Sequence, residues 1–254
     1  MSAFGYWLAA GLFLPLFPLS MLLNFLFGRV RNAPVRSLLL LVWPQIGLSL
    51  VPASDAPVPG WFVPLVLLTA ALYAFRAVSV REVGQWVGYL ATSAWALLWI
   101  AVLSNQSGSQ LVRVYALGFS LPLVLLTLLG TQLEQRFGAA YTGLYGGLAQ
   151  MLPRLSGVLV CVVLAVVATP MFPGFFAMLA TVMATVPTAP AVALVMVGIW
   201  LLWSWAGARL LQGLIVGPVN APGAPDLSMA STWTYAAVLI ALLVGGLYVT
   251  GDLL

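Results

Sequence analysis

Few side chains in this chain could transfer protons, bind metals or act as nucleophiles. The 254 residues include five acidic residues, one cysteine and no histidine, and all nine basic residues are arginines. Glu82 and Glu134 lie close to arginines at predicted helix ends, where solvated charges are common, and no deeper group continues a proton relay from them. The sequence has no G-x-S-x-G motif, no phosphate-binding loop and no paired carboxylates within its apolar segments. A membrane enzyme is therefore the least expected function.

The ligands of the common metal cofactors are also missing. Histidine-ligated haem, structural zinc and iron–sulfur clusters need several histidine or cysteine ligands. Cys161 is the single cysteine and lies in an apolar run. We expect it to be a small residue packed between helices, because free cysteine behaves as a small hydrophobe. The sequence predicts no cofactor and no metal site.

The elements that position these residues are apolar helices. No charged side chain occurs between Leu155 and Ala208, and only 6% of all residues are charged, against roughly 25% in soluble domains. A membrane crossing needs about 20 apolar helical residues. Apolar segments fall at 4–27, 37–51, 61–76, 85–104, 111–133, 155–169, 172–186, 190–215 and 232–250. They predict an all-α, polytopic transmembrane helical bundle of eight or nine segments.

We expect a single integral membrane domain over residues 1–254. Its parts are an N-terminal helix pair, middle helices, a cytoplasmic linker, and a final part with a broken helix and C-terminal helices, at 1–52, 61–133, 134–153 and 154–254. Pro170, Pro173 and Gly174 predict the break, near 170–174. If the segments on both sides cross fully, Arg209 is outside; if they form one broken unit, Arg209 stays inside. The positive-inside rule favours the broken unit.

Arginines mark one set of loops. Loops with arginine alternate with arginine-poor loops at 52–60 and 104–110, which predicts a cytoplasmic (inner) membrane protein whose N-terminus is outside. We expect the cytoplasmic charges to form a docking surface for a partner: Arg29, Arg31, Arg36, Arg76, Arg81, Glu134, Arg136 and Arg154.

The polar residues within the apolar segments are uncharged. Gly84 and Gly88 form a G-x-x-x-G pattern, which allows close helix packing but also arises by chance among 24 glycines. The other polar residues could line a wet path, although helix-packing contacts are more expected: Asn24, Gln45, Thr69, Thr92, Ser93, Ser120, Thr127, Thr181, Thr185 and Ser204.

Several segments resemble antiporter-like membrane subunits, the group that includes subunits of respiratory complex I, Mrp-type antiporters and the membrane partner of an inorganic-carbon pump. Leu144–Arg154 (LYGGLAQMLPR) is similar to the Y-G-G-L-x-x-x-M-P motif of that group. Ala168–Phe176 (ATPMFPGFF) resembles its G-x-P-G-x-x-G-F helix break, and Arg81–Ser93 resembles a degraded D-L-K-R-x-x-A-Y-S-S-x-S-H stretch. The resemblance spans about residues 61–252 and implies a truncated, degenerate antiporter-like scaffold.

The departures from this group concern its ionisable residues. Gly84 stands where the D-L-K motif has lysine, Gly118 where the next helix has histidine, and Met178 where the half-helix after the break has Lys or Glu. The resemblance therefore implies a membrane scaffold that has lost its own proton path.

This combination predicts a non-catalytic, accessory subunit of a larger proton- or ion-coupled complex. Two kinds of complex remain open: a respiratory, complex I-like (NADH-quinone oxidoreductase-like) assembly, and an inorganic-carbon (bicarbonate/CO2) uptake complex. Expected partners are the lipid bilayer, a full-length antiporter-like subunit and a cytoplasmic catalytic subunit, zinc-bearing in the second case, but not nucleic acid. The alternative is an autonomous small-solute carrier that uses the broken helix as its site.

Overall fold

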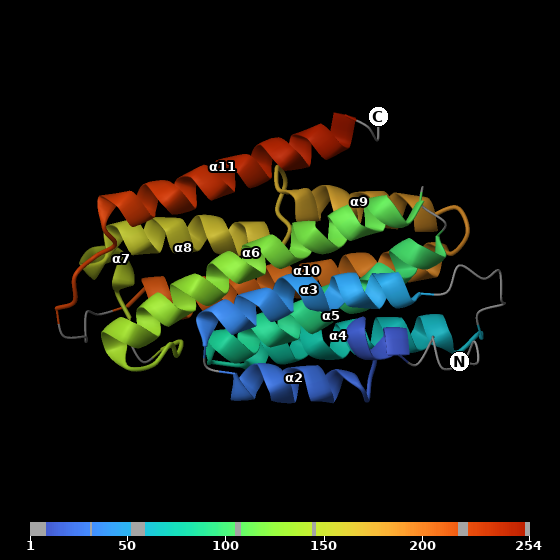
Figure 1. Cartoon of the computed structure of the whole chain (residues 1–254), viewed down its shortest axis with the longest axis horizontal. Helices are drawn as coiled ribbons and strands as arrows, with labels where there is room; N and C mark the ends of the chain where they lie inside the picture. The colour runs from blue at the N-terminus through green and yellow to red at the C-terminus, as the bar shows by residue number, and fades with distance from the viewer. Residues whose placement is uncertain are drawn as a thin grey trace.

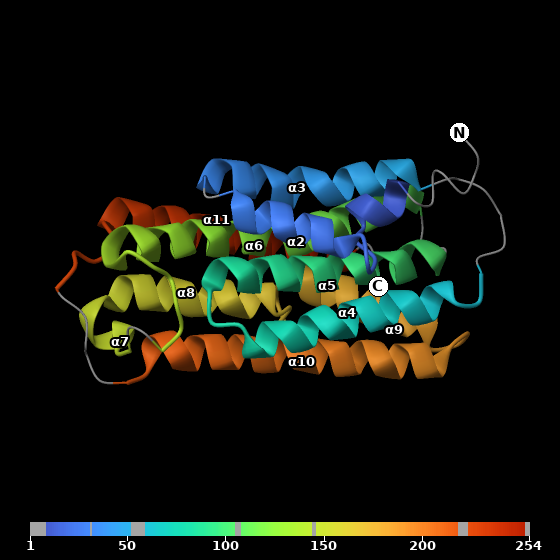
Figure 2. The ribbon, with the colours of Figure 1, turned by 90° about the horizontal axis from the view of Figure 1, so that it is seen from below.

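The structure, a computed structural model, describes residues 9–30, 32–51, 59–104, 108–143, 146–217 and 223–251. These residues form a bundle of long, roughly parallel and antiparallel helices (Figures 1 and 2). The helices are α2 (Ser20–Arg29), α3 (Ala33–Leu50), α4 (Phe62–Ser79), α5 (Val83–Leu103), α6 (Gly108–Phe137), α7 (Leu148–Met151), α8 (Pro153–Val166), α9 (Pro173–Thr185), α10 (Pro190–Ile215) and α11 (Met229–Gly251). Within these ranges the only β-type pairing is an isolated bridge between Glu82 and Tyr141.

The chain is an integral membrane protein of the predicted all-α class. Six of the described helices are long and apolar enough to cross a membrane, namely α3, α4, α5, α6, α10 and α11. The shorter apolar helices α8 and α9 contain 14 and 13 residues. Each of these two is about 20 Å long at 1.5 Å per residue, which is too short for a crossing of about 30 Å.

The helix expected over residues 4–27 is interrupted. Residues 9–13 are helical, the chain then leaves the helix, and α2 begins only at Ser20. Pro15 and Pro18 lie in the interruption; proline removes a backbone donor and clashes with the preceding turn, which breaks a helix. The expectation of one continuous first helix is therefore wrong in its described part, and residues 1–8 lie outside the described ranges.

The next helices follow the predicted pattern with longer bounds. Helix α3 begins at Ala33 and continues through Pro44, as expected for a proline within a membrane helix. Helix α6 also contains a proline, Pro122, and runs on to Phe137, so it includes Glu134 and Arg136. It ends where Gly138 takes a φ of +79°, a backbone conformation that glycine adopts at helix ends.

Helices α8 and α9 form one broken unit. They follow one another in the same direction, and α10 returns antiparallel to them (Figure 1). Arg209, six residues before the end of α10, consequently lines the same cavity as Arg81, which follows α4. Of the two alternatives for this region, the structure adopts the one that keeps Arg209 with the other arginines.

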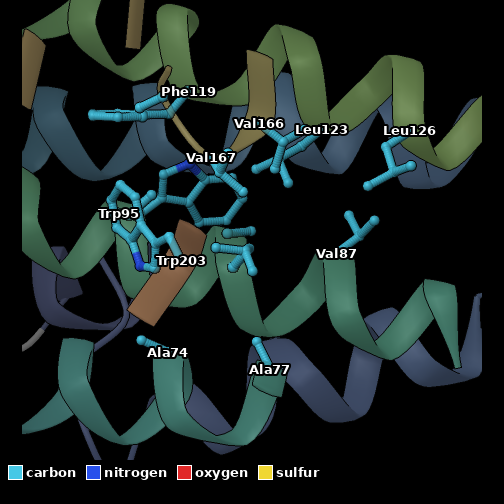
Figure 3. Packing of buried hydrophobic residues seen from close by; sticks show 14 of the residues in the cluster. Ala74, Ala77, Val87, Trp95, Phe119, Leu123, Leu126, Val166, Val167 and Trp203 are labelled. Carbon is cyan, nitrogen blue, oxygen red and sulfur yellow. The ribbon is translucent and has the colours of Figure 1, made fainter. Parts of the chain in front are cut away.

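Helix α5 lies at the centre of the bundle and packs against α2, α4, α6 and α10. All residues from Leu90 to Ala101 are buried. Trp95 of α5, Phe119 of α6 and Trp203 of α10 meet in the core (Figure 3), where the rings of Phe119 and Trp203 contact edge to face at 5.9 Å. Cys161 is exposed on α8, so the expectation that it packs between helices of this chain is wrong.

Candidate functional site

The helix break is the most irregular part of the apolar interior. Helix α8 ends at Val166, and the link to α9 contains two residues with positive φ, Ala168 (55°) and Met171 (87°). Pro173 then starts α9, where a missing N–H costs no helical hydrogen bond. Pro170, Pro173 and Gly174 thus lie in and next to the break that the sequence predicts.

The last carbonyl groups before the break are hydrogen-bonded. Trp200 of α10 donates its indole N–H to the carbonyl oxygens of Val167 and Ala168, at 3.2 Å each. Helix C-terminal carbonyls carry partial negative charge and often bind cations in broken helices. Here a neutral donor from the same chain already occupies them. A shallow hollow of about 180 Å³ lies beside this contact, lined by Ala168, Thr169, Pro170, Val197, Trp200, Leu201 and Ser204.

Two glycines let neighbouring helices approach the break. A Cβ atom placed on Gly118 of α6 would lie 3.3 Å from Pro173 Cβ, and one on Gly246 of α11 would lie 2.9 Å from Pro173 N. Both distances are shorter than ordinary van der Waals contacts. The space beside position 118, one of the three positions predicted to have lost an ionisable residue, is therefore taken by the break itself.

Gly84 lies beside the side chain of Arg36. A Cβ placed on Gly84 would be 2.9 Å from Arg36 Nη1 and 3.5 Å from Glu82 Oε1. Arg36 itself is only 7% exposed, donates from Nε to the carbonyl of Val30 and lies 5.2 Å above the ring of Phe27. The Arg36 guanidinium therefore takes the space that a side chain at position 84 would need. Arg36 belongs to the interior rather than to an exposed docking surface.

Met178 and Gly88 are also buried. Met178 of α9 is 1% exposed, so this position holds an apolar side chain within the core. Gly88 lies against α2, where a Cβ would be 3.1 Å from Asn24 Oδ1 and 3.3 Å from Phe27. The G-x-x-x-G pattern thus contributes to close packing of α2 on α5 at its second glycine.

Neutral polar groups connect α2 to its neighbours. Ser20 Oγ donates to the hydroxyl of Tyr73 on α4 at 3.0 Å. Asn24 Nδ2 donates to Thr92 Oγ1 on α5 at 2.9 Å. Each pair bridges two helices without a group that titrates near neutral pH.

A second set of hydrogen bonds between uncharged groups joins α5 to α4, α6 and α10. Trp203 donates its indole N–H to Ser93 Oγ at 2.8 Å, and Ser93 donates onward to the carbonyl of Ala70 at 2.8 Å. Trp95 donates its indole N–H to Ser120 Oγ at 3.2 Å. These tryptophan–serine pairs were not predicted, because indole donors find their partners only once the helices pack together. The uncharged polar residues here make helix-packing contacts, as expected.

The other predicted docking residues lie at one end of the bundle. Arg29 stacks on Phe25, and Arg76 stacks on Tyr73 and Tyr89, with the guanidinium 5.2 to 5.9 Å from the ring centres. These two side chains and Arg81 are exposed, Glu134 is half-buried, and Arg31 lies outside the described residues.

Arg136 and Arg154 hold the segment before α11. Arg136 Nε donates to the carbonyl of Pro225 at 2.9 Å, and Arg154 Nη1 donates to that of Leu227 at 3.3 Å. Asp226, in the same segment, accepts hydrogen bonds from the backbone N–H groups of Arg154 and Leu155, at 3.0 and 3.1 Å. A side chain from 71 residues downstream therefore caps the N-terminus of α8.

The environment of Asp226 stabilises its charged form. Burial raises the pKa of the carboxyl, but backbone hydrogen bonds from Arg154, Leu227 and Leu155 and the Arg154 charge outweigh it and leave the pKa below its ordinary value of 3.8. Among the described residues, no three His, Cys, Asp or Glu side chains come close enough to hold a metal ion.

The fold is similar to membrane chains of several solved complexes. A chain of respiratory complex I from Thermus thermophilus with bound NADH superposes with a TM-score of 0.86 at 23% identity, over 97% of this chain and 54% of that chain. A chain of the Mrp complex from Dietzia sp. DQ12-45-1b gives 0.82 at 16%, over 97% and 55%. A chain of the membrane-bound sulfane sulfur reductase, an archaeal respiratory membrane complex, gives 0.76 at 18%, over 96% and 52%.

This chain spans about half the length of the chains that it matches. No protein-family model and no curated protein sequence matches it. The structural likeness confirms, at the level of the fold, the resemblance carried by the Y-G-G-L and P-G motifs. The chain has the fold of the antiporter-like membrane chains found in complex I-like and Mrp complexes.

Proposed function

We propose that this chain is an accessory, non-catalytic membrane subunit of a larger proton- or ion-coupled complex. One observation carries the proposal: the polar contacts between α5 and α2, α4, α6 and α10 are made by neutral groups. A proton path needs groups that load and release protons near the working pH. Serine, threonine, asparagine and tryptophan do not titrate there, and the ordinary pKa of tyrosine is about 10.

The three positions at which the sequence departs from the antiporter-like motifs support the same function. Gly84 lies beside the Arg36 guanidinium, Gly118 against Pro173, and Met178 is buried. Neighbouring atoms crowd the two glycine positions, and the third holds an apolar side chain in the core. We infer that this interior is a packed scaffold and that any ion path of the complex runs through a partner or along the interface with one.

The partners are proposed from the kinds of complex that contain this fold. The matching chains come from larger complexes, two of which are respiratory. A full-length antiporter-like subunit is the proposed membrane neighbour. The end of the bundle with Arg29, Arg76, Arg81 and Arg209 is the proposed docking surface for a cytoplasmic subunit, which would be zinc-bearing if the assembly takes up inorganic carbon.

The proposed location is the inner membrane, with the arginine-rich end in the cytoplasm. Arginines gather where α2, α4, α6 and α10 end and where α3, α5 and α8 begin (Figure 2). The positive-inside rule places that end in the cytoplasm. The first and last described residues, 9 and 251, lie at the opposite end, so they would be outside.

The test is purification of the tagged full chain from its native membranes in a mild detergent, followed by mass spectrometry. A stoichiometric antiporter-like or catalytic partner is expected. The control is an unrelated tagged membrane protein expressed at the same level. A folded, solitary chain that transports protons in liposomes would overturn the proposal.

The hollow beside the break favours one second candidate, the autonomous carrier of a small solute. Its lining is mostly apolar, and Trp200 already binds the Val167 and Ala168 carbonyl groups. Solute uptake by the solitary chain in liposomes, abolished by Trp200→Phe but not by Trp205→Phe, would favour the carrier.

A further inference from the structure

A cavity of about 530 Å³ opens at the arginine-rich end of the bundle. It lies between the end of α4, the start of α5, the loop after α6 and the last turns of α10. The polar side chains that line it include Arg81, Thr142, Arg209 and Gln212, and Trp86 forms part of its wall.

Backbone hydrogen bonds fix the walls of this cavity. Thr142 N donates to the carbonyl of Arg81 at 2.8 Å, and Gly143 N donates to that of Gly213 at 2.9 Å. A Cβ on Gly213 would lie only 2.9 Å from Thr142 Cβ, so glycine is needed for the loop to approach α10 this closely. The segments that carry Arg81 and Arg209 are therefore held together by the fold.

The donors around the cavity lack acceptors. The side chains of Arg81 and Arg209 form no hydrogen bond or ion pair with any described residue. The indole nitrogen of Trp86 is buried and has no hydrogen-bond partner within the described part of the chain. The indole nitrogen is closed off from the cavity by its burial, so the donors open to a ligand there are the side chains of Arg81 and Arg209.

The charge of the cavity is positive. Glu82 follows Arg81 directly, but its Oε1 lies 3.5 Å from the Cβ position of Gly84, on the side of α5 where Arg36 also lies. The acidic residues elsewhere do not line the cavity. Arg81 and Arg209 both line it, and the planar fork of the arginine guanidinium matches the oxygen atoms of phosphate.

The cavity lies near the ends of two helices long and apolar enough to cross a membrane, α4 and α10. Its lining includes Ser79, the last residue of α4, and Arg209, which is six residues and therefore about 9 Å from the end of α10. Basic pockets between transmembrane helices at this level bind anionic headgroups.

We propose that this cavity is a phosphate-binding site formed by Arg81 and Arg209, with Gln212 and Thr142 as further hydrogen-bonding side chains. The phosphate is carried by an anionic phospholipid or is free in water. Arg81 and Arg209 also belong to the proposed docking surface, so phosphate binding is measured on the chain without a partner subunit, where it does not depend on the proposed function.

The test compares three forms of the full chain in a non-ionic detergent: wild type, the double variant R81Q/R209Q and the matched control R29Q. Arg29 is exposed at the same end of the bundle but lies outside the cavity. Native mass spectrometry and equilibrium titration measure binding of phosphatidylglycerol, phosphatidylcholine and inorganic phosphate.

Wild type and R29Q should bind phosphate-bearing anions equally. The double variant should bind about 25-fold more weakly, at roughly fivefold per arginine near a membrane surface. If the chain binds phosphatidylglycerol more tightly than phosphatidylcholine, and inorganic phosphate does not compete with phosphatidylglycerol, the site binds a lipid. Binding of inorganic phosphate with the same dependence on the two arginines identifies a free-anion site.

Equal binding by wild type and the double variant, or no binding of either probe to wild type, would overturn the proposal. Circular dichroism and size-exclusion chromatography establish that each variant is folded. If the double variant is not, R209Q and R209K replace it, because Arg209 is exposed. R209K should bind better than R209Q, since it keeps the charge but loses the bidentate fork.

Discussion

Gly118 of α6 lies directly against Pro173, the first residue of α9, with a Cβ position 3.3 Å from Pro173 Cβ. This contact brings the broken helix onto the middle of the bundle. A side chain at position 118 would meet both Pro173 and the backbone of Gly174.

Gly118→Ala should lower the thermal unfolding midpoint, because the added methyl group meets the backbone of the break as well as the proline ring. Overpacking of this kind costs about 1–3 kcal/mol. Gly118→His should lower the midpoint further. Differential scanning fluorimetry in detergent measures both. Gly198→Ala is the control, since nothing lies within 4 Å of its Cβ position; equal effects at both positions would contradict the close contact.

Trp203→Phe should destabilise the bundle by removing the 2.8 Å bond to Ser93 Oγ while keeping an aromatic ring. Hydrogen bonds between membrane helices contribute about 0.6–2 kcal/mol. The matched control is Trp205→Phe, because Trp205 is 58% exposed on the same helix. Denaturant titration in mixed micelles measures the difference, and a larger loss for the Trp205 variant would argue against the network.

Asp226→Asn should weaken the cap of α8. Loss of an N-cap side chain costs about 1 kcal/mol, and asparagine keeps a hydrogen-bond acceptor but loses the charge. Asp226→Ala should therefore cost more. Hydrogen exchange at the first turn of α8 reports the change directly, and unaltered exchange in the alanine variant would show that the cap is unimportant.

The Asp226 cap should also depend on pH. The pKa of Asp226 is below its ordinary value of 3.8 in the folded chain, so the folded state favours the charged carboxylate. Its contribution to stability is fully present above pH 3.8 and is lost as the pH falls through the lowered pKa. As the pH falls from 5 through the lowered pKa of Asp226, the wild type should lose more stability than Asp226→Asn. Parallel pH profiles of the free energy of unfolding would contradict this.

Met178→Lys should destabilise the chain without creating transport. A lysine at the centre of a membrane helix costs about 3 kcal/mol, and Met178 is buried with no acidic partner from the described residues. Met178→Leu is the control, since it keeps the volume. A pH-sensitive dye in liposomes detects proton flux; flux through the lysine variant alone would contradict the accessory-subunit proposal.

The sequence predicts the helices well because membrane helices depend mainly on local apolarity. The break near Pro170–Gly174 and the continuation of α3 through Pro44 are both confirmed. The interruption before α2 was missed because the apolar run hides Pro15 and Pro18. Hydropathy alone reports composition and not whether the backbone bonds can form.

The contacts of the interior could not be predicted in the same way. The Arg36 guanidinium reaches Gly84 only because the bundle brings the start of α3 near the start of α5, whereas the charge pattern alone predicts an arginine at the surface. The cap that Asp226 places on α8 joins residues 71 positions apart. Such contacts depend on tertiary structure, for which hydropathy and local motifs carry no signal.

The gathering of arginines at one end also has an electrical consequence. If the chain were inserted upside down, each guanidinium would have to move across the membrane potential, which costs about 2.3 kcal/mol per charge at 100 mV. Arg113, near the start of α6 at the opposite end, opposes this effect by one charge, and so does each of the acidic residues at the arginine end, Glu82, Glu134 and Asp226. An energised membrane that is negative on the arginine side therefore maintains the orientation of the inserted protein, and it does so more strongly as the voltage rises.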